Sequence, residues 1–78
     1  MIFLIDYDRT KGEIVTLRRF DESSKHEAAD VRLELELSLH RQGIDREVVL
    51  LEAENEQAIR KTHRRYFENL EELAKTEL

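Results

Sequence analysis

The sequence lacks cysteine and proline and contains only two glycines in 78 residues. Without cysteine there is no disulfide framework, no thiolate metal site and no thiol nucleophile, so the core or an oligomer interface has to supply the stability. Two glycines are too few for a phosphate-binding glycine loop. A chain of this length buries only about 60% of the surface that its unfolded form exposes. We therefore expect one domain over residues 1–78, without a deep active-site cleft.

Long apolar runs are also scarce. The N-terminal run, Met1–Ile5, stops at Asp6 and is too short for a signal-peptide core or a membrane span. Thirteen cationic and eighteen acidic side chains give a net charge of −5, which repels phosphate backbones and anionic lipid as a whole. Apolar residues nevertheless make up 40% of the chain in ordered patterns, which argues against disorder. The sequence predicts a folded cytoplasmic protein that does not bind membranes.

A β-hairpin is expected at the start of the chain. Residues 1–7 and 13–20 are rich in Ile, Val, Phe and Tyr, and the turn between them contains Gly12, which can adopt positive φ. Pairing Tyr7 with Ile14 predicts two apolar faces. One face carries Met1, Phe3, Ile5, Tyr7, Ile14 and Phe20, and the other carries Ile2, Leu4, Val15 and Leu17. Both faces of this small sheet then need cover.

The next segment, residues 24–42, admits two interpretations. Ser24 and Glu27 have the spacing of a capping box and Gly43 is a typical helix terminator, whereas apolar and polar residues alternate over 31–39 as they do in a strand. The abundance of Leu, Glu, Ala and Arg favours the helix. Its apolar residues form two rows about 160° apart. They are Ala28, Val31, Leu35 and Leu39 in the first row and Ala29, Leu33 and Leu37 in the second.

A third strand and a second helix complete the pattern. Residues 47–53 contain a continuous apolar run, and Asn55 is a suitable N-cap for a helix over residues 56–76. A right-handed crossover after the second strand, with the third strand placed beside the first, gives the order 2-1-3. The prediction is an α+β fold in a ββαβα arrangement, in which a three-stranded antiparallel sheet carries two helices and dimerisation completes the structure.

Polar residues in apolar surroundings are the candidates for chemistry. His63 falls in the apolar row of the last helix, and Asp6, on the first strand, is a candidate partner for it. A hydrogen-bonded structural histidine is favoured over a catalytic one. Asp6, Asp8 and Glu13 could together hold Mg²⁺, but this spacing is common at hairpin ends, where Asp binds the local backbone. We expect no metal or other cofactor, and a small hydrolase or metal-dependent enzyme around Asp6, Asp8 and His63 is the third of our hypotheses.

The most conspicuous charge cluster lies in the last helix. Arg60, Lys61, Arg64 and Arg65 share one side of it, where a nucleic acid could bind. Glu68 follows Arg64 at the spacing of a helical ion pair, and no aromatic residue is interleaved on the basic side. A solvated face or a protein contact is therefore favoured, and a nucleic-acid-binding module is the alternative.

The leading hypothesis for function is a homodimer, or a module that binds another protein, without catalytic activity. Its basis is the amount of apolar surface. The strands are apolar on both faces and the helix carries two apolar rows, and together they present more apolar surface than one short chain can bury by itself. The residues expected at the interface are Leu33, Leu37, Tyr66, Phe67 and Leu70.

Overall fold

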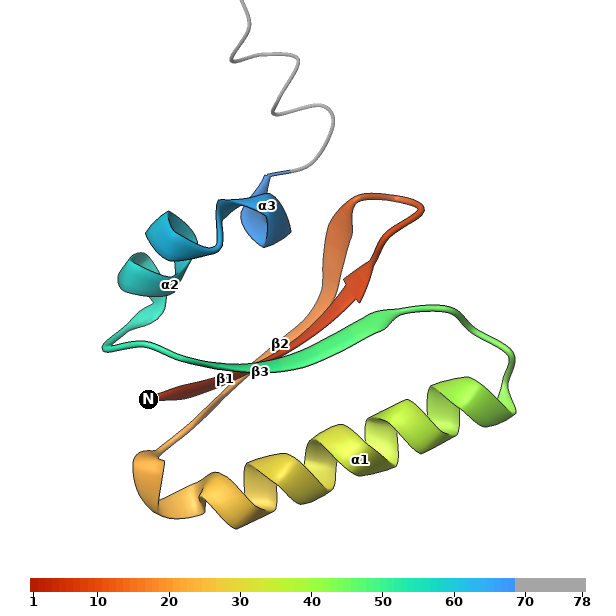
Figure 1. Cartoon of the computed structure of the whole chain (residues 1–78), viewed down its shortest axis with the longest axis horizontal. Helices are drawn as coiled ribbons and strands as arrows, with labels where there is room; N and C mark the ends of the chain where they lie inside the picture. The colour runs from red at the N-terminus through yellow and green to blue at the C-terminus, as the bar shows by residue number, and fades with distance from the viewer. Residues whose placement is uncertain (69–78) are drawn as a thin grey trace, which may run out of the picture.

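The computed structural model describes residues 1–68 of the chain. Its strands are β1 (Ile2–Asp8), β2 (Glu13–Phe20) and β3 (Glu47–Glu52). Its helices are α1 (Lys25–Arg41), α2 (Glu56–Thr62) and α3 (Arg64–Phe67), and a short 3₁₀ helix, Glu22–Ser24, precedes α1. Figure 1 shows the arrangement, with α1 on one side of the sheet and α2 and α3 on the other.

The sheet has the order β2-β1-β3, and both neighbours run antiparallel to β1, as predicted. The central strand is the most apolar one, and every residue of Ile2–Tyr7 is buried. The apolar composition of β1 fits its central position, because only a strand that is covered on both faces and paired on both edges can bury a continuous apolar run. The α+β fold class is confirmed.

Each face of the sheet has its own hydrophobic core. On the α1 side, Ile2 and Leu4 pack with Ala28, and the half-buried Val48 and Leu50 of β3 pack against them. On the side of α2 and α3, the buried residues come from β1 and from both helices. They are Phe3, Ile5, Tyr7, Ile59 and Tyr66. The two apolar faces predicted for β1 are thus both covered by helices.

A β-bulge in β2 changes the predicted faces of that strand. Tyr7 pairs with Ile14 as expected, but Asp6 pairs with Thr16, so Val15 is the extra residue. Beyond the bulge every side chain of β2 moves to the opposite face. Leu17 consequently packs on the side of Phe3 and Ile5, and Phe20 packs on the α1 side, which reverses our assignment of both. The alternation rule fails here because it assumes an uninterrupted pleat.

Residues 25–41 form a helix, so the strand-like alternation over 31–39 did not decide the structure. The helix ends as predicted, with Gly43 at φ +69°, and Gly43 and Ile44 donate backbone hydrogen bonds to the carbonyls of His40 and Leu39. This is the Schellman arrangement. The prediction of a capping box was wrong, because the side chain of Ser24 makes no capping hydrogen bond. The backbone N–H of Ser24 instead donates a hydrogen bond to the carbonyl of Asp21 in the preceding 3₁₀ turn.

The predicted helix over residues 56–76 is interrupted. Asn55 caps α2 as expected, accepting a 2.8 Å hydrogen bond from the backbone N–H of Ala58. At His63 the backbone leaves the helical region, with φ −126° and ψ 52°, before α3 begins. Ile59 and Tyr66, which lie on either side of the break, both enter one core, where Tyr66 packs edge-on against Tyr7 at 5.1 Å between ring centroids. The part of the prediction beyond residue 68 lies outside the described residues.

Candidate interaction surface

The side of α1 that faces away from the sheet carries exposed leucines. Ala28 and Leu39 of the first apolar row are buried, as a row packed on the sheet requires. In the second row Leu33 is 51% exposed and Leu37 is 45% exposed. Helices α2 and α3 lie on the opposite face of the sheet, so they cannot cover this row (Figure 1). Two neighbouring leucines on one helix face therefore remain available for a partner.

The open edge of β3 is a second candidate for contact. Ala53 donates a backbone hydrogen bond to the carbonyl of Met1, which identifies that pair as the hydrogen-bonded type. In an antiparallel ladder the types alternate, so Leu51, Val49 and Glu47 direct their N–H and C=O groups to β1. The backbone groups of the intervening residues then point away from the sheet. These residues are Val48, Leu50 and Glu52.

The side chains of β3 remain only half-buried even though four consecutive ones, Val48–Leu51, are apolar. Their partners on β1 are fully buried. The difference follows from position, because nothing in residues 1–68 pairs with the outer edge of β3. Strand β3 has no proline, lysine or bulge, the devices that usually protect an exposed edge. An apolar edge of this kind is a template for another strand.

The other edge of the sheet, formed by β2, is protected. The bulge at Val15 interrupts its regular spacing. Arg18 and Arg19 are both exposed near its end, and the guanidinium of Arg18 lies 5.0 Å from the centre of the Phe20 ring. Bulges and cationic side chains both disfavour the addition of a strand.

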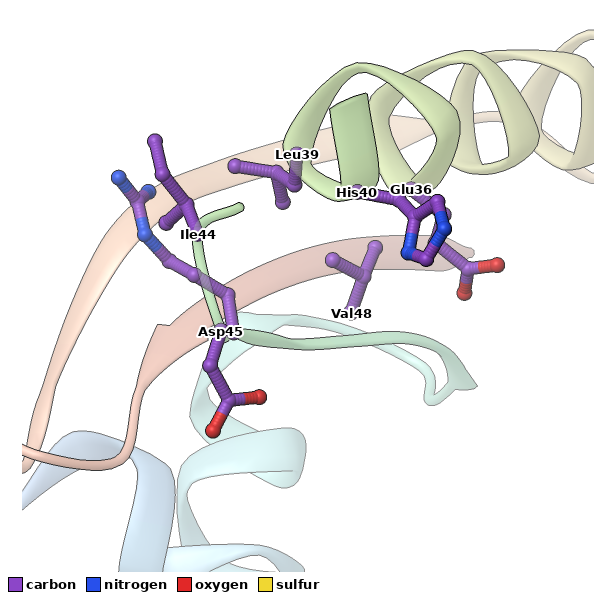
Figure 2. A pocket seen from close by; sticks show the side chains of 7 residues that line it. Glu36, Leu39, His40, Ile44, Asp45 and Val48 are labelled. Atoms are coloured by element: carbon purple, nitrogen blue, oxygen red, sulfur yellow. The ribbon is translucent and has the colours of Figure 1, made fainter. Parts of the chain in front are cut away.

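A hollow of about 240 Å³ lies where the end of α1 meets the start of β3. Leu39, Ile44 and Val48 supply its apolar lining, and Figure 2 shows the carboxylates of Glu36 and Asp45 pointing outward from it in different directions. Arg46 and His40 complete the lining. Because apolar groups and both signs of charge line the hollow, it has no marked preference for a small anion or a small cation. It lies between the end of α1 and the β3 edge, so the two surfaces are continuous here.

Asp6 is buried as expected, but its partner is Arg46 and not His63. The Nη1 atom of Arg46 lies 2.8 Å from Oδ2 of Asp6, whose side chain is 3% exposed. Asp6 follows Ile2 and Leu4 at two-residue spacing, so it faces α1, whereas His63 lies beside Tyr66 on the opposite side of the sheet. The Asp6–His63 pair was therefore a wrong prediction. Asp8 shares the face of Asp6, so the three groups of the hydrolase hypothesis do not converge.

Glu47, at the start of β3, organises a polar cluster on the opposite face. Its carboxylate accepts hydrogen bonds from the hydroxyl of Tyr66 and from the guanidinium groups of Arg65 and Arg9, at 2.6 Å for Arg65 and 3.2 Å for Arg9. The Tyr66 hydroxyl, followed by the two arginines, holds the pKa of Glu47 below its ordinary value. Burial, followed by the hydrogen bond to Glu47 and then by the negative charge of Glu47, raises the pKa of Tyr66. The cluster fastens α3 to the sheet.

Most of the basic residues of the nucleic-acid hypothesis have acidic partners. Arg60 pairs with Glu56 at 3.4 Å, Arg64 with Glu68 at 2.7 Å and Arg65 with Glu47 at 2.6 Å. Arg60, Lys61 and Arg64 also line a shallow hollow of about 360 Å³ with Phe67, and the guanidinium of Arg60 lies 4.7 Å from the centre of the Phe67 ring. The structure brings these cations together, but largely neutralises them.

The residues proposed for the interface occupy different environments. Leu33 and Leu37 are exposed on α1. Tyr66 is 5% exposed and belongs to the core, so it offers little surface to a partner, and Phe67 is half-buried beneath Arg60. Leu70 lies outside the described residues. Contact with a partner stays a prediction for this group.

Two further properties concern residues 1–68 alone. No cluster of three or more His, Asp or Glu side chains in this range is arranged to hold a metal ion. None of the helices here combines the length and the apolar character needed to cross a bilayer.

Sequence reasoning missed the roles of Arg46, Glu47 and the open edge of β3. The edge had a signal, since the order 2-1-3 together with the run Val48–Leu51 already places an apolar strand at the border of the sheet. The two charged residues gave none, because their partners are distant in sequence. Comparison of this chain with protein-family models, curated proteins and solved structures gave no match.

Proposed function

We propose that this protein is a small protein-interaction module without catalytic activity, and that its partner is a second copy of the same chain. The observation that carries the proposal is the apolar surface that the fold leaves uncovered on α1, where Leu33 and Leu37 are about half-exposed. Exposed leucines one helical turn apart are typical of a contact surface rather than of isolated surface residues.

The half-buried side chains of β3 support the same proposal. Helix α1 packs on β3 and β1, so the apolar edge and the exposed row belong to adjoining elements. An interface that includes the β3 edge and the exposed row of α1 would remove from water the apolar side chains that the helices do not cover. The hydrophobic effect favours this burial in proportion to the apolar area removed from water.

Sedimentation equilibrium over a range of protein concentrations tests the proposal with a double variant, Leu33→Gln and Leu37→Gln. Glutamine keeps high helix propensity, so the fold should persist. We expect the dimer dissociation constant to rise at least about tenfold, because apolar contact is lost in both copies. Val15→Gln is the matched control, since Val15 is equally exposed but lies on the protected β2 edge. Equal effects of the control and the double variant would contradict the proposal.

A second candidate function, binding of a nucleic acid, is favoured by one observation. Arg60, Lys61 and Arg64 surround Phe67 in a shallow hollow, and a cationic surface beside an aromatic ring suits a single-stranded base and its phosphate. The ion pairs of Arg60 and Arg64 with Glu56 and Glu68 weaken this candidate. A titration with labelled single-stranded RNA at several salt concentrations tests it, because phosphate contacts give a steep loss of affinity with ionic strength.

A further inference from the structure

We propose that two copies of the chain join through their β3 edges, antiparallel and with Val49 opposite Val49, to form a continuous six-stranded sheet. This inference rests on the proposed self-association and adds the place and the register of the contact. It accounts for an apolar strand that the described residues leave unpaired on one side.

The outward backbone groups limit the possible registers. Val48, Leu50 and Glu52 present their N–H and C=O groups to the open edge, so a second β3 has to pair outward residues with outward residues. With Val49 opposite Val49, Val48 pairs with Leu50 of the second copy and Leu50 pairs with Val48. These apolar side chains would then meet across the two-fold axis on the α1 face.

Apolar and charged side-chain pairing together select this register among its neighbours. It places Arg46, two residues before Val48, opposite Glu52 of the second copy, and symmetry repeats the pair at the other end. The Glu52 side chain is 60% exposed and is held by Lys25 of α1 at 3.2 Å. Arg46 keeps its contact with Asp6 within its own chain, and Glu36 lines the same hollow, so acidic and basic side chains are both present at each end of the interface. In the two neighbouring registers that keep outward residues paired, either Val48 would lie opposite the charged Glu52 or Arg46 would lie opposite Leu50, so only the proposed register pairs apolar with apolar and cation with anion.

The helical layer fits the same arrangement. Helix α1 packs over β3 and β1, about one strand spacing, 4.8 Å, from the proposed two-fold axis. Two such helices on one face would lie about 10 Å apart, a normal distance for packed helices. Lys25 lies on the side of α1 that faces β3, and Ala29 follows it one turn later. Ala29 would meet the second α1, and Leu33 and Leu37, which face away from the sheet, would lie along the outer rim of this contact.

The β2 edge does not offer an equivalent contact. A second β2 paired there would meet the bulge at Val15, which would interrupt the ladder, and the exposed Arg18 and Arg19 disfavour strand addition at this edge. Pairing β2 of one copy with β3 of the next would leave free edges at both ends and generate filaments instead of a closed dimer. Only the β3 edge is regular, apolar and compatible with a two-fold axis.

Single cysteines test the contact, because the chain has none of its own. In Val49→Cys the two thiols would lie in a non-hydrogen-bonded pair, with about 4.5 Å between Cα atoms, which suits a disulfide. We expect covalent dimer under mild oxidation, measured by non-reducing electrophoresis and mass spectrometry. Val15→Cys on the β2 edge is the matched control and should form no covalent dimer. Crosslinking of Val15→Cys but not of Val49→Cys would overturn the inference.

Charge reversal tests the register. Glu52→Lys would face Arg46 of the second copy at both ends, so the dimer dissociation constant should rise about tenfold, while Glu54→Lys should leave it nearly unchanged. A larger effect of Glu54→Lys would overturn the register. Sedimentation of the unmodified chain separates this inference from the proposed function. A dimer whose Val49→Cys variant does not crosslink would contradict β3 pairing alone, whereas a monomer at every concentration would contradict both.

Discussion

Arg46 donates a hydrogen bond to Asp6 at 2.8 Å, joining the residue before β3 to the central strand across the interior of the protein. The Oδ1 atom of Asp6 is buried and receives no hydrogen bond from residues 1–68. The carboxylate therefore depends on this one guanidinium among the described side chains, because an unpaired buried charge is strongly unfavourable.

We predict that Arg46→Met lowers the free energy of unfolding by about 3 kcal/mol, because it leaves a buried carboxylate without its cation. Urea denaturation at fixed protein concentration measures the change. Asp6→Leu combined with Arg46→Met should be less destabilising than the sum of the two single variants, since both charges then leave the interior. Strict additivity would show that the two side chains act independently.

The Glu47–Tyr66 contact predicts how stability depends on pH. Because the pKa of Glu47 is lowered in the folded protein, its contribution is present above the ordinary carboxylate pKa and is lost as the pH falls through the folded value. Glu47→Gln should therefore reduce the loss of stability on acidification, measured by urea denaturation across the acidic range. The same change at Glu34, exposed on α1, should leave the acid profile intact.

Tyr66 gives the complementary prediction at alkaline pH. Its pKa is raised, so its contribution is fully present below the ordinary tyrosine pKa and is lost as the pH rises through the folded value. Removing the neighbouring negative charge in Glu47→Gln should lower the pKa of Tyr66, which ultraviolet absorbance of the tyrosinate detects. An unchanged tyrosine titration in the variant would mean that Glu47 does not influence this hydroxyl.

We predict that the fold requires glycine at position 43 only because of its positive φ angle, and not because a side chain there would clash. Its φ of +69° is unfavourable for other residues, while a Cβ placed there would have no heavy atom within 4 Å. Gly43→Ala should therefore cost about 1 kcal/mol of unfolding free energy. Gly43→Asn should cost less, because asparagine tolerates the left-handed region. Thermal or urea unfolding of the pair distinguishes conformational strain from a steric clash, which would make the larger asparagine the worse variant.

The sequence predicted the order of elements because the decisive signals are local. Gly43 and Asn55 ended and began helices as their residue types require, and the apolar composition of β1 identified the central strand. Helix propensity over residues 31–39 prevailed over the alternating pattern, because Ala28, Val31 and Leu35 can still form one helical row on the sheet.

The errors arise where distant contacts decide the structure. Nothing in β2 alone marks Val15 as a bulge, so Leu17 and Phe20 were assigned to the wrong faces. The helix breaks at His63, three residues before Tyr66, whose contacts with Tyr7 and Glu47 join segments that are far apart in sequence. Asp6 was recognised as an unusual buried group, but its partner could not be found without the position of Arg46.

Sedimentation equilibrium of the unmodified protein, from micromolar to millimolar concentration, tests self-association most directly. We predict a reversible shift from the 9.3 kDa chain to a species of twice that mass, without larger assemblies, because a β3–β3 contact closes on itself. A mass of 9.3 kDa over the whole range would contradict the account.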